Sequence, residues 1–399
     1  MLEWLPKNGR LLFLAKTLRV FGFGFLSIIL PLYMLRLGYP ALVIGAVLSS
    51  AVIGSVIFNL LVSKFSDSFG RKKSLMMLSV LMGVSTALMI ANLGTALFIV
   101  AALIGSVSVT GSETGPFLAI EQSSITTQVS DKNRTKAYSI YNFLGYSAAA
   151  VGALFSAVPT LFNNVISGYH VVLYSYLVIS ILLILIYIPL SGTIESQKRK
   201  SRVKISKETR KIIIKLAALF SIDAFGGGFI LQSLLALWFN SRYGLNLDYL
   251  AVLFLVTNSI TAVSILLAPL VAKRIGLLKT MVVTHIISNC ALITIPLAPS
   301  LFYAITFLLI RQSLSQMDVP ARQSYTMAIV KPNERTATAG ITNTPRSVAQ
   351  SISPILSSYF IGTFQYALPF FFSGSIKIFY DVLIFLSFRK IKPPEEKRK

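Results

Sequence analysis

The sequence predicts an all-α polytopic membrane protein, with twelve transmembrane helices in two six-helix halves and both termini in the cytoplasm. Its 399 residues are 54% hydrophobic and only 13% charged, whereas soluble chains carry about 25% charged residues. The apolar residues form long continuous runs, without the alternation at period two that a membrane β-barrel requires. The second half of the chain also repeats motifs of the first.

Twelve apolar runs are long enough to cross the hydrocarbon core of a bilayer, which takes about 20 helical residues. The fourth and tenth runs are longer than a crossing needs, so we expect part of each to tilt or to project into the cytoplasm. The runs are residues 12–35, 41–63, 74–93, 96–129, 137–159, 170–191, 212–240, 247–272, 280–298, 301–330, 337–361 and 367–388.

The basic residues indicate how the chain is oriented. There are 37 Lys and Arg residues against 14 Asp and Glu, a net charge of +23, which in a soluble chain would suggest nucleic-acid binding. Here most of them occupy the termini and alternate gaps between the runs, while the other gaps hold only Arg36 and Arg242. Cytoplasmic loops of membrane proteins are enriched in this way. We therefore expect a multi-pass protein of the plasma membrane, in contact with the lipid bilayer and not with nucleic acid.

The longest basic gap, residues 196–211, is predicted to be a cytoplasmic linker between halves 1–195 and 212–399, each with six spans. Phe21, Gly22, Gly24 and Phe25 recur as Phe225, Gly226, Gly228 and Phe229. In the same way Gln122, Ser123, Arg134 and Asn142 recur as Gln323, Ser324, Arg335 and Asn343. Because both halves have the same number of spans in the same orientation, we expect them to be related by an axis along the membrane normal.

The gap between the second and third runs carries a recognisable pattern. Residues 63–73 read S-K-F-S-D-S-F-G-R-K-K. With the twelve runs and the repeat, this gap resembles the major facilitator superfamily, whose loop motif is G-x-x-x-D-R-x-G-R-R/K; Ser63 and Ser68 depart from it. The resemblance implies secondary transport by alternating access and a cavity lined by spans one, four, seven and ten. It also implies a gating role for Asp67, Gly70, Arg71 and Lys72. The alternative is that these basic residues only set the topology.

Ionisable residues inside the apolar runs are costly to bury, so each is a candidate functional residue. Those that we expect to bind substrate or to couple transport to an ion are Arg19, Glu113, Glu121, Asp223, Arg311, Asp318 and Arg322. Arg346 in span eleven is charged too. Lys377 and Asp381 lie four residues apart, which favours a structural pair on one helix, and Lys16 is expected to extend its ammonium group towards the membrane surface.

The repeat predicts which of these charges pair. Arg19 and Asp223 are equivalent positions with opposite signs, and so are Glu121 and Arg322. We therefore expect one pair in each half, because either charge buried alone would be prohibitive. Asp318 lies one helical turn before Arg322 and competes for it. Such pairs are either structural or exchange partners during transport, and the sequence leaves both interpretations open. Glu113 has no obvious partner and is a further candidate proton carrier.

Several classes of function are not expected. A single cysteine, Cys290, forbids an internal disulfide, and no Cys/His cluster predicts a metal site. His170 and His285 are isolated in the sequence and are given no role. No G-x-x-x-x-G-K-[ST] loop is present, so we expect neither a bound nucleotide nor any other cofactor. The chain is not expected to be an enzyme.

The most favoured function is proton-coupled export of a small organic compound by a monomeric secondary transporter. The family's antiporters carry G-x-x-x-G-P-x-x-G in span five; here the stretch has Ala148, Gly152 and Ser156 and lacks the proline, and its small residues are equally explained by helix packing. The alternative is a symporter that takes up an anionic or zwitterionic metabolite, with Arg19, Arg322 or Arg311 holding a carboxylate. A non-transporting lipid-handling or receptor-like protein is less favoured.

Overall fold

The computed structural model describes residues 5–105, 107–111, 115–129, 131–195, 206–330 and 335–391. These residues form α-helices and short 3-10 helices, and no strand is found among them. The chain divides into two compact units, Met1–Lys200 with Leu231–Asn258, and Ser201–Ile230 with Ser259–Lys399. We call them unit 1 and unit 2.

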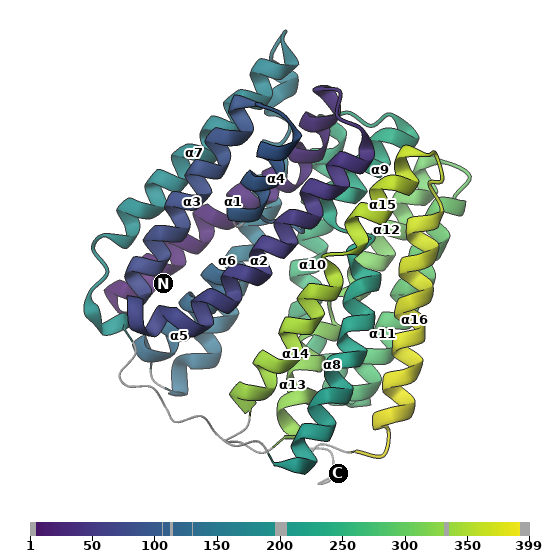
Figure 1. The fold of residues 1–399 in the computed structure, drawn as a ribbon. Coiled ribbons are helices and arrows are strands. Elements are labelled where there is room, and N and C mark those ends of the chain that lie inside the picture. Colours follow the sequence, from purple (N-terminus) through teal and green to yellow (C-terminus); the bar gives the residue numbers. More distant parts are fainter. Residues whose placement is uncertain are drawn as a thin grey trace. The chain divides into compact units, whose positions relative to one another are not determined.

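In unit 1 the long helices α1, α3, α6 and α7 lie side by side (Figure 1). α1 packs against α6 and α7, and α3 packs against α7 and α4. α9 belongs to this unit because Gln232 donates to Ser27 Oγ (2.9 Å) and Ser233 donates to the Val109 carbonyl (2.9 Å). The elements are α1 (Lys7–Arg36), α2 (Ala41–Phe69), α3 (Arg71–Ala91), α4 (Thr95–Ile104), α5 (Pro116–Gln128), α6 (Asp131–Phe155), η1 (Val158–Leu161), α7 (Val165–Tyr187), η2 (Gly192–Ile194), α9 (Gln232–Tyr243) and the first part of α10 (Leu247–Ile275).

Unit 2 is held together by an apolar core between α8, α11, α13 and α16, with Phe220, Met281, Tyr325 and Tyr380 among its buried members. Its charged side chains, described below, lie beside this core. The elements are α8 (Lys207–Gly228), the second part of α10, α11 (Leu277–Thr294), η3 (Ile295–Leu297), α12 (Leu301–Ser315), α13 (Asp318–Ala328), α14 (Arg335–Gln350), α15 (Ser353–Gly362) and α16 (Leu368–Phe388).

Four of the predicted spans are each divided between two helices. Residues 96–129 contain α4 and α5, and residues 212–240, 301–330 and 337–361 contain α8 with α9, α12 with α13, and α14 with α15. The breaks follow the sequence: α8 ends in three glycines, α5 begins at Pro116 after Gly115, and Pro354 stands in the first turn of α15. Glycine is a poor helix former and proline lacks the N–H that a helix interior needs.

Within the described part, nine helices are long and apolar enough to cross a membrane. The total of twelve spans therefore remains a prediction.

The repeated Phe-Gly motif brings helices into close contact. In α1, a Cβ added at Gly24 would collide with the Ala149 carbonyl of α6, and one at Gly152 of α6 would collide with the Phe21 carbonyl. In unit 2, Ser357 of α15 donates to the Phe229 carbonyl (2.8 Å). Gly24 of the motif and Gly152 of span five therefore allow α1 and α6 to pack closely.

Candidate functional site

A closed ion pair lies in unit 1. Arg19 of α1 donates from Nη1 to Glu121 Oε1 (2.9 Å) and from Nη2 to Oε2 (2.7 Å), and neither residue is exposed to solvent. This is the two-point contact by which a planar guanidinium best matches a carboxylate. The predicted Arg19–Glu121 pair is thus confirmed.

Three aromatic side chains complete the pair. Tyr141 of α6 donates to Glu121 Oε2 (2.5 Å) and Tyr187 of α7 donates to Oε1 (2.9 Å). Arg19 also donates to the Tyr187 hydroxyl (2.8 Å) and lies 4.4 Å from the centre of the Phe117 ring. Each carboxylate oxygen therefore accepts one hydrogen bond from Arg19 and one from a tyrosine. We name these five residues the unit 1 cluster.

Lys16 does not reach the membrane surface, contrary to the prediction. It is buried, and its Nζ lies 3.8 Å from the centre of the Tyr141 ring. α1 is covered here by α6, so the side chain finds an aromatic face instead of a path to water. A cation over a ring is a favourable arrangement in an apolar region.

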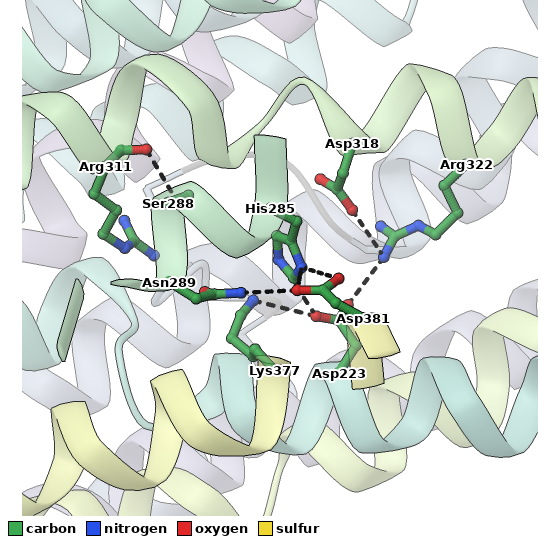
Figure 2. Close-up of polar contacts among 9 residues, drawn as sticks. All are labelled: Asp223, His285, Ser288, Asn289, Arg311, Asp318, Arg322, Lys377 and Asp381. Atoms are coloured by element: carbon green, nitrogen blue, oxygen red, sulfur yellow. Dashed lines mark hydrogen bonds and ion pairs between the residues drawn. The ribbon is translucent and has the colours of Figure 1, made fainter. Parts of the chain in front are cut away.

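Unit 2 contains a larger network of charged side chains around Arg322 of α13 (Figure 2). Arg322 Nη1 donates to Asp223 Oδ2 on α8 (2.9 Å) and lies 3.4 Å from Asp318 Oδ2, one turn before it on α13. The predicted pair is confirmed, and so is the competition of two carboxylates for one guanidinium. All three residues are buried.

The charges of α16 have partners on other helices, which corrects the prediction that Lys377 and Asp381 pair with each other. Lys377 Nζ donates to Asp223 Oδ1 (3.2 Å). Asp381 contacts His285 Nδ1 of α11 through both carboxylate oxygens (2.8 and 3.0 Å) and accepts from Asn289 (3.2 Å). Each of these charges has its partner on a neighbouring helix, which the spacing of residues within α16 does not indicate.

His285 connects the two carboxylates. Its Nε2 lies 3.7 Å from Asp223 Oδ1, while its Nδ1 contacts Asp381. The continuous set drawn in Figure 2 therefore runs from Asp318 to Arg322, Asp223, His285 and Asp381, with Lys377 beside Asp223. We name the six residues the unit 2 cluster. They come from α8, α11, α13 and α16.

Sequence reasoning missed His285 because histidine was not counted with the charged residues inside the spans. The same rule applied to every titratable residue would have found it, since His285 lies well within an apolar run. No sequence signal marked Tyr141 and Tyr187, because tyrosine is common in apolar helices.

Two arginines in unit 2 lack a carboxylate. Arg311 of α12 donates to the side chain of its neighbour Gln312 (2.8 Å), and its Nε is buried without a hydrogen bond. Arg346 of α14 also has a buried Nε without a hydrogen-bond partner, and it has no ion pair within the described residues.

The predicted gating loop forms hydrogen bonds with residues that follow span six. Gly70 has φ +101°, a conformation that favours glycine. It precedes α3, whose first two N–H groups, of Arg71 and Lys72, donate to the carboxylate of Glu195 (2.6 and 3.2 Å). The Arg71 guanidinium donates to the Ile194 carbonyl (3.0 Å). A carboxylate at a helix N-terminus is favourable because it satisfies free N–H groups.

Two predicted site residues lie outside the part that the structure describes: Glu113, and the side chain of Asp67. Among the described residues, no group of three or more His, Cys, Asp or Glu side chains is arranged to hold a metal ion.

Within the described residues, the long apolar helices and the ion pairs buried among them indicate a multi-pass membrane protein. The family model of the Major Facilitator Superfamily matches residues 12–315. The chain therefore belongs to this family and is a secondary transporter.

Relatives and solved structures agree with this assignment. An uncharacterised membrane protein of Saccharomyces cerevisiae is 23% identical, over 95% of this chain and 93% of the yeast protein. The structure of a D-xylose-proton symporter has a TM-score of 0.76 and 14% identity, over 98% of this chain and 99% of that one. The nucleoside transporter NupG has a TM-score of 0.75 and 13% identity, over 96% and 100%. At these identities the solved structures show the fold alone.

Proposed function

We propose that this protein moves a small organic compound across the plasma membrane in a step coupled to protons, and that the unit 2 cluster is the coupling site. The observation that carries the proposal is the sharing of cations by carboxylates: Arg322 faces both Asp223 and Asp318, and Asp223 also binds Lys377. A side chain with two competing partners can change between them without leaving a charge unpaired in apolar surroundings.

The proton has few places to bind in this cluster. Arginine stays charged at every relevant pH, so a proton must be carried by a carboxylate or by the imidazole of His285. Protonation of Asp223 removes its negative charge and releases Arg322 to Asp318. Protonation of Asp318 has the opposite effect. His285 lies between Asp223 and Asp381 and can pass a proton from one to the other.

The unit 1 cluster is a poor candidate for the same role. Glu121 has both oxygens filled by Arg19 and two tyrosines, and the pair is closed to solvent. We propose that Arg19 and Glu121 hold α1, α5, α6 and α7 together. We therefore assign the coupling of protons to transport to the unit 2 cluster.

Two directions of transport fit this site. Export in exchange for protons was favoured by the small residues of span five, but these residues are used in packing α6 against α1. Uptake of an anionic solute together with a proton is favoured by the competition just described, since protonating a carboxylate frees a cation. We therefore propose export and uptake as the two possible directions of transport. An experiment can distinguish them.

The test is solute-driven proton flux in proteoliposomes that contain a pH dye. Drugs, sugars, amino acids and organic acids are added outside. Exchange with protons makes the lumen alkaline, whereas cotransport makes it acidic. No flux with any solute would contradict the proposal.

The site is tested with Asp223→Asn and Asp318→Asn, each with and without an imposed pH gradient. We expect at least one of the two to lose accumulation against the solute gradient while it keeps solute exchange without a gradient. If both still accumulate solute, the proton is carried elsewhere, and Glu113 is the next residue to change. If both lose exchange as well, the acids are structural.

A further inference from the structure

Arg346 of α14 differs from the other arginines inside the helices. Arg19 and Arg322 have carboxylate partners, and Arg311 has a side-chain amide. Arg346 has a buried Nε for which the structure shows no hydrogen-bond partner. A buried guanidinium N–H without an acceptor is unfavourable, so this side chain is suited to receive an acceptor from a solute.

The charges of unit 2 leave room for an anion. Among the described side chains of unit 2, the buried carboxylates are Asp223, Asp318 and Asp381, and the basic side chains that are not exposed are Arg311, Arg322, Arg346 and Lys377. Without counting His285, these cations exceed the carboxylates by one. The charges of Arg322, Asp223 and Asp318 act electrostatically on Arg346. One bound negative charge would balance this set.

The equivalent place in unit 1 is filled. The repeat aligns Arg346 with Gly145 of α6, and a Cβ added at Gly145 would lie 2.6 Å from Lys16 Cε. The stem of Lys16 thus occupies that space, and its ammonium group lies over Tyr141. Both units hold a cation here, and in unit 1 the cation lies over the ring of Tyr141.

The surrounding sequence of α14 suits a path for polar solutes. Thr342, Asn343, Thr344, Arg346 and Ser347 follow one another with only Pro345 between them. Side chains of this kind are rarely placed against lipid and usually line a protein or water-filled surface. Arg346 itself is partly exposed although its Nε is buried.

We propose that Arg346 binds the oxyanion group of the transported solute, so that the substrate is an organic anion such as a carboxylate, phosphate ester or sulfonate. This inference rests on the proposed function and adds the substrate class to it. The planar guanidinium fork can donate two parallel hydrogen bonds to any of these groups. Nearby Arg322 is held by Asp223 and Asp318 until a proton releases it.

The experiment compares solutes that differ only in charge, in proteoliposomes with a pH dye. The pairs are glucose 6-phosphate with glucose, glutarate with glutaramide, and benzenesulfonate with benzenesulfonamide. We expect at least one anion to drive proton flux and its neutral partner to drive none. We expect Arg346→Gln to raise the half-saturating concentration of that anion about tenfold or more, and Arg346→Lys to recover part of the loss.

Arg242→Gln is the matched control, because Arg242 is exposed in unit 1 and outside both clusters; it should behave as the unchanged protein does. Flux driven equally by the anions and their neutral partners would overturn the inference and leave the proposed function intact. An unchanged half-saturating concentration in Arg346→Gln would also overturn it. Absence of flux with all six solutes would overturn it too, and flux with cationic drugs that lack an acidic group would then show that only the substrate class is wrong.

Discussion

Arg19 and Glu121 offer a direct test of pairing inside the membrane. Changing Arg19→Gln or Glu121→Gln alone leaves the partner charge without compensation, at a cost of about 3–5 kcal/mol. The double variant removes both charges and should recover part of that loss, because two amides can still hydrogen-bond to each other and to Tyr187.

Thermal unfolding in detergent, with the yield of folded protein, measures these differences. Since both side chains are fully buried, the effect should persist in high salt. A double variant as unstable as the sum of the two single variants would show that the side chains act independently.

At this scale the sequence predicted the pairs because burial of charge follows a simple electrostatic rule and because the repeat inverts the signs. It did not predict the partners of Lys377 and Asp381. Residues four apart on a helix can pair, but within unit 2 Asp223 and His285 on neighbouring helices come closer. Such choices depend on the rotation of each helix about its axis, which a hydropathy pattern does not determine.

At the scale of helices and loops, the contact between Glu195 and α3 is the feature most open to test. Its carboxylate accepts from the N–H groups of Arg71 and Lys72. Glu195→Gln removes the charge from this helix end and should destabilise the protein by about 0.5–2 kcal/mol.

The measurement is the shift in thermal unfolding temperature in detergent. Asp248→Asn is the matched control, because Asp248 is an exposed carboxylate in the first turn of α10, and it should cause a smaller shift. Equal shifts in the two variants would mean that Glu195 acts only through its charge, and that its hydrogen bonds to the start of α3 add no stability.

The loop motif in the sequence marked Gly70 but not the residue that the loop contacts. The glycine pattern indicates the turn because few other residues adopt φ +101°. Glu195 follows the sixth apolar run, more than 120 residues later, and its approach depends on how α3 and α7 pack. The breaks within four spans are likewise local in origin, since glycines and prolines stand at three of them.

For the whole molecule, the orientation in the membrane is still a prediction from the distribution of basic residues. Ser201 lies in the predicted cytoplasmic linker and outside the described residues. In a Cys290→Ser background, Ser201→Cys should resist an impermeant thiol reagent added to intact cells. Arg242→Cys, in a gap predicted to face outwards, should react.

Permeabilised cells provide the control for Ser201→Cys, which should then be labelled. Labelling of Ser201→Cys in intact cells, with Arg242→Cys protected, would reverse the topology. The Cys290 substitution is needed because this cysteine is exposed.

The reversed polarity of the equivalent pairs has a consequence for how the two halves diverged. Turning an Arg–Glu pair into an Asp–Arg pair takes two substitutions, and the state between them would set like charges against each other in apolar surroundings. Unit 2 holds further ions that would offset such a state. Lys377, which contacts Asp223, would offset two neighbouring acids, and Asp318, which contacts Arg322, would offset two neighbouring arginines. We propose that these further counter-ions let Arg322 exchange partners within one transport cycle. They would equally have made the reversal of polarity tolerable during evolution, whereas unit 1 keeps its closed pair.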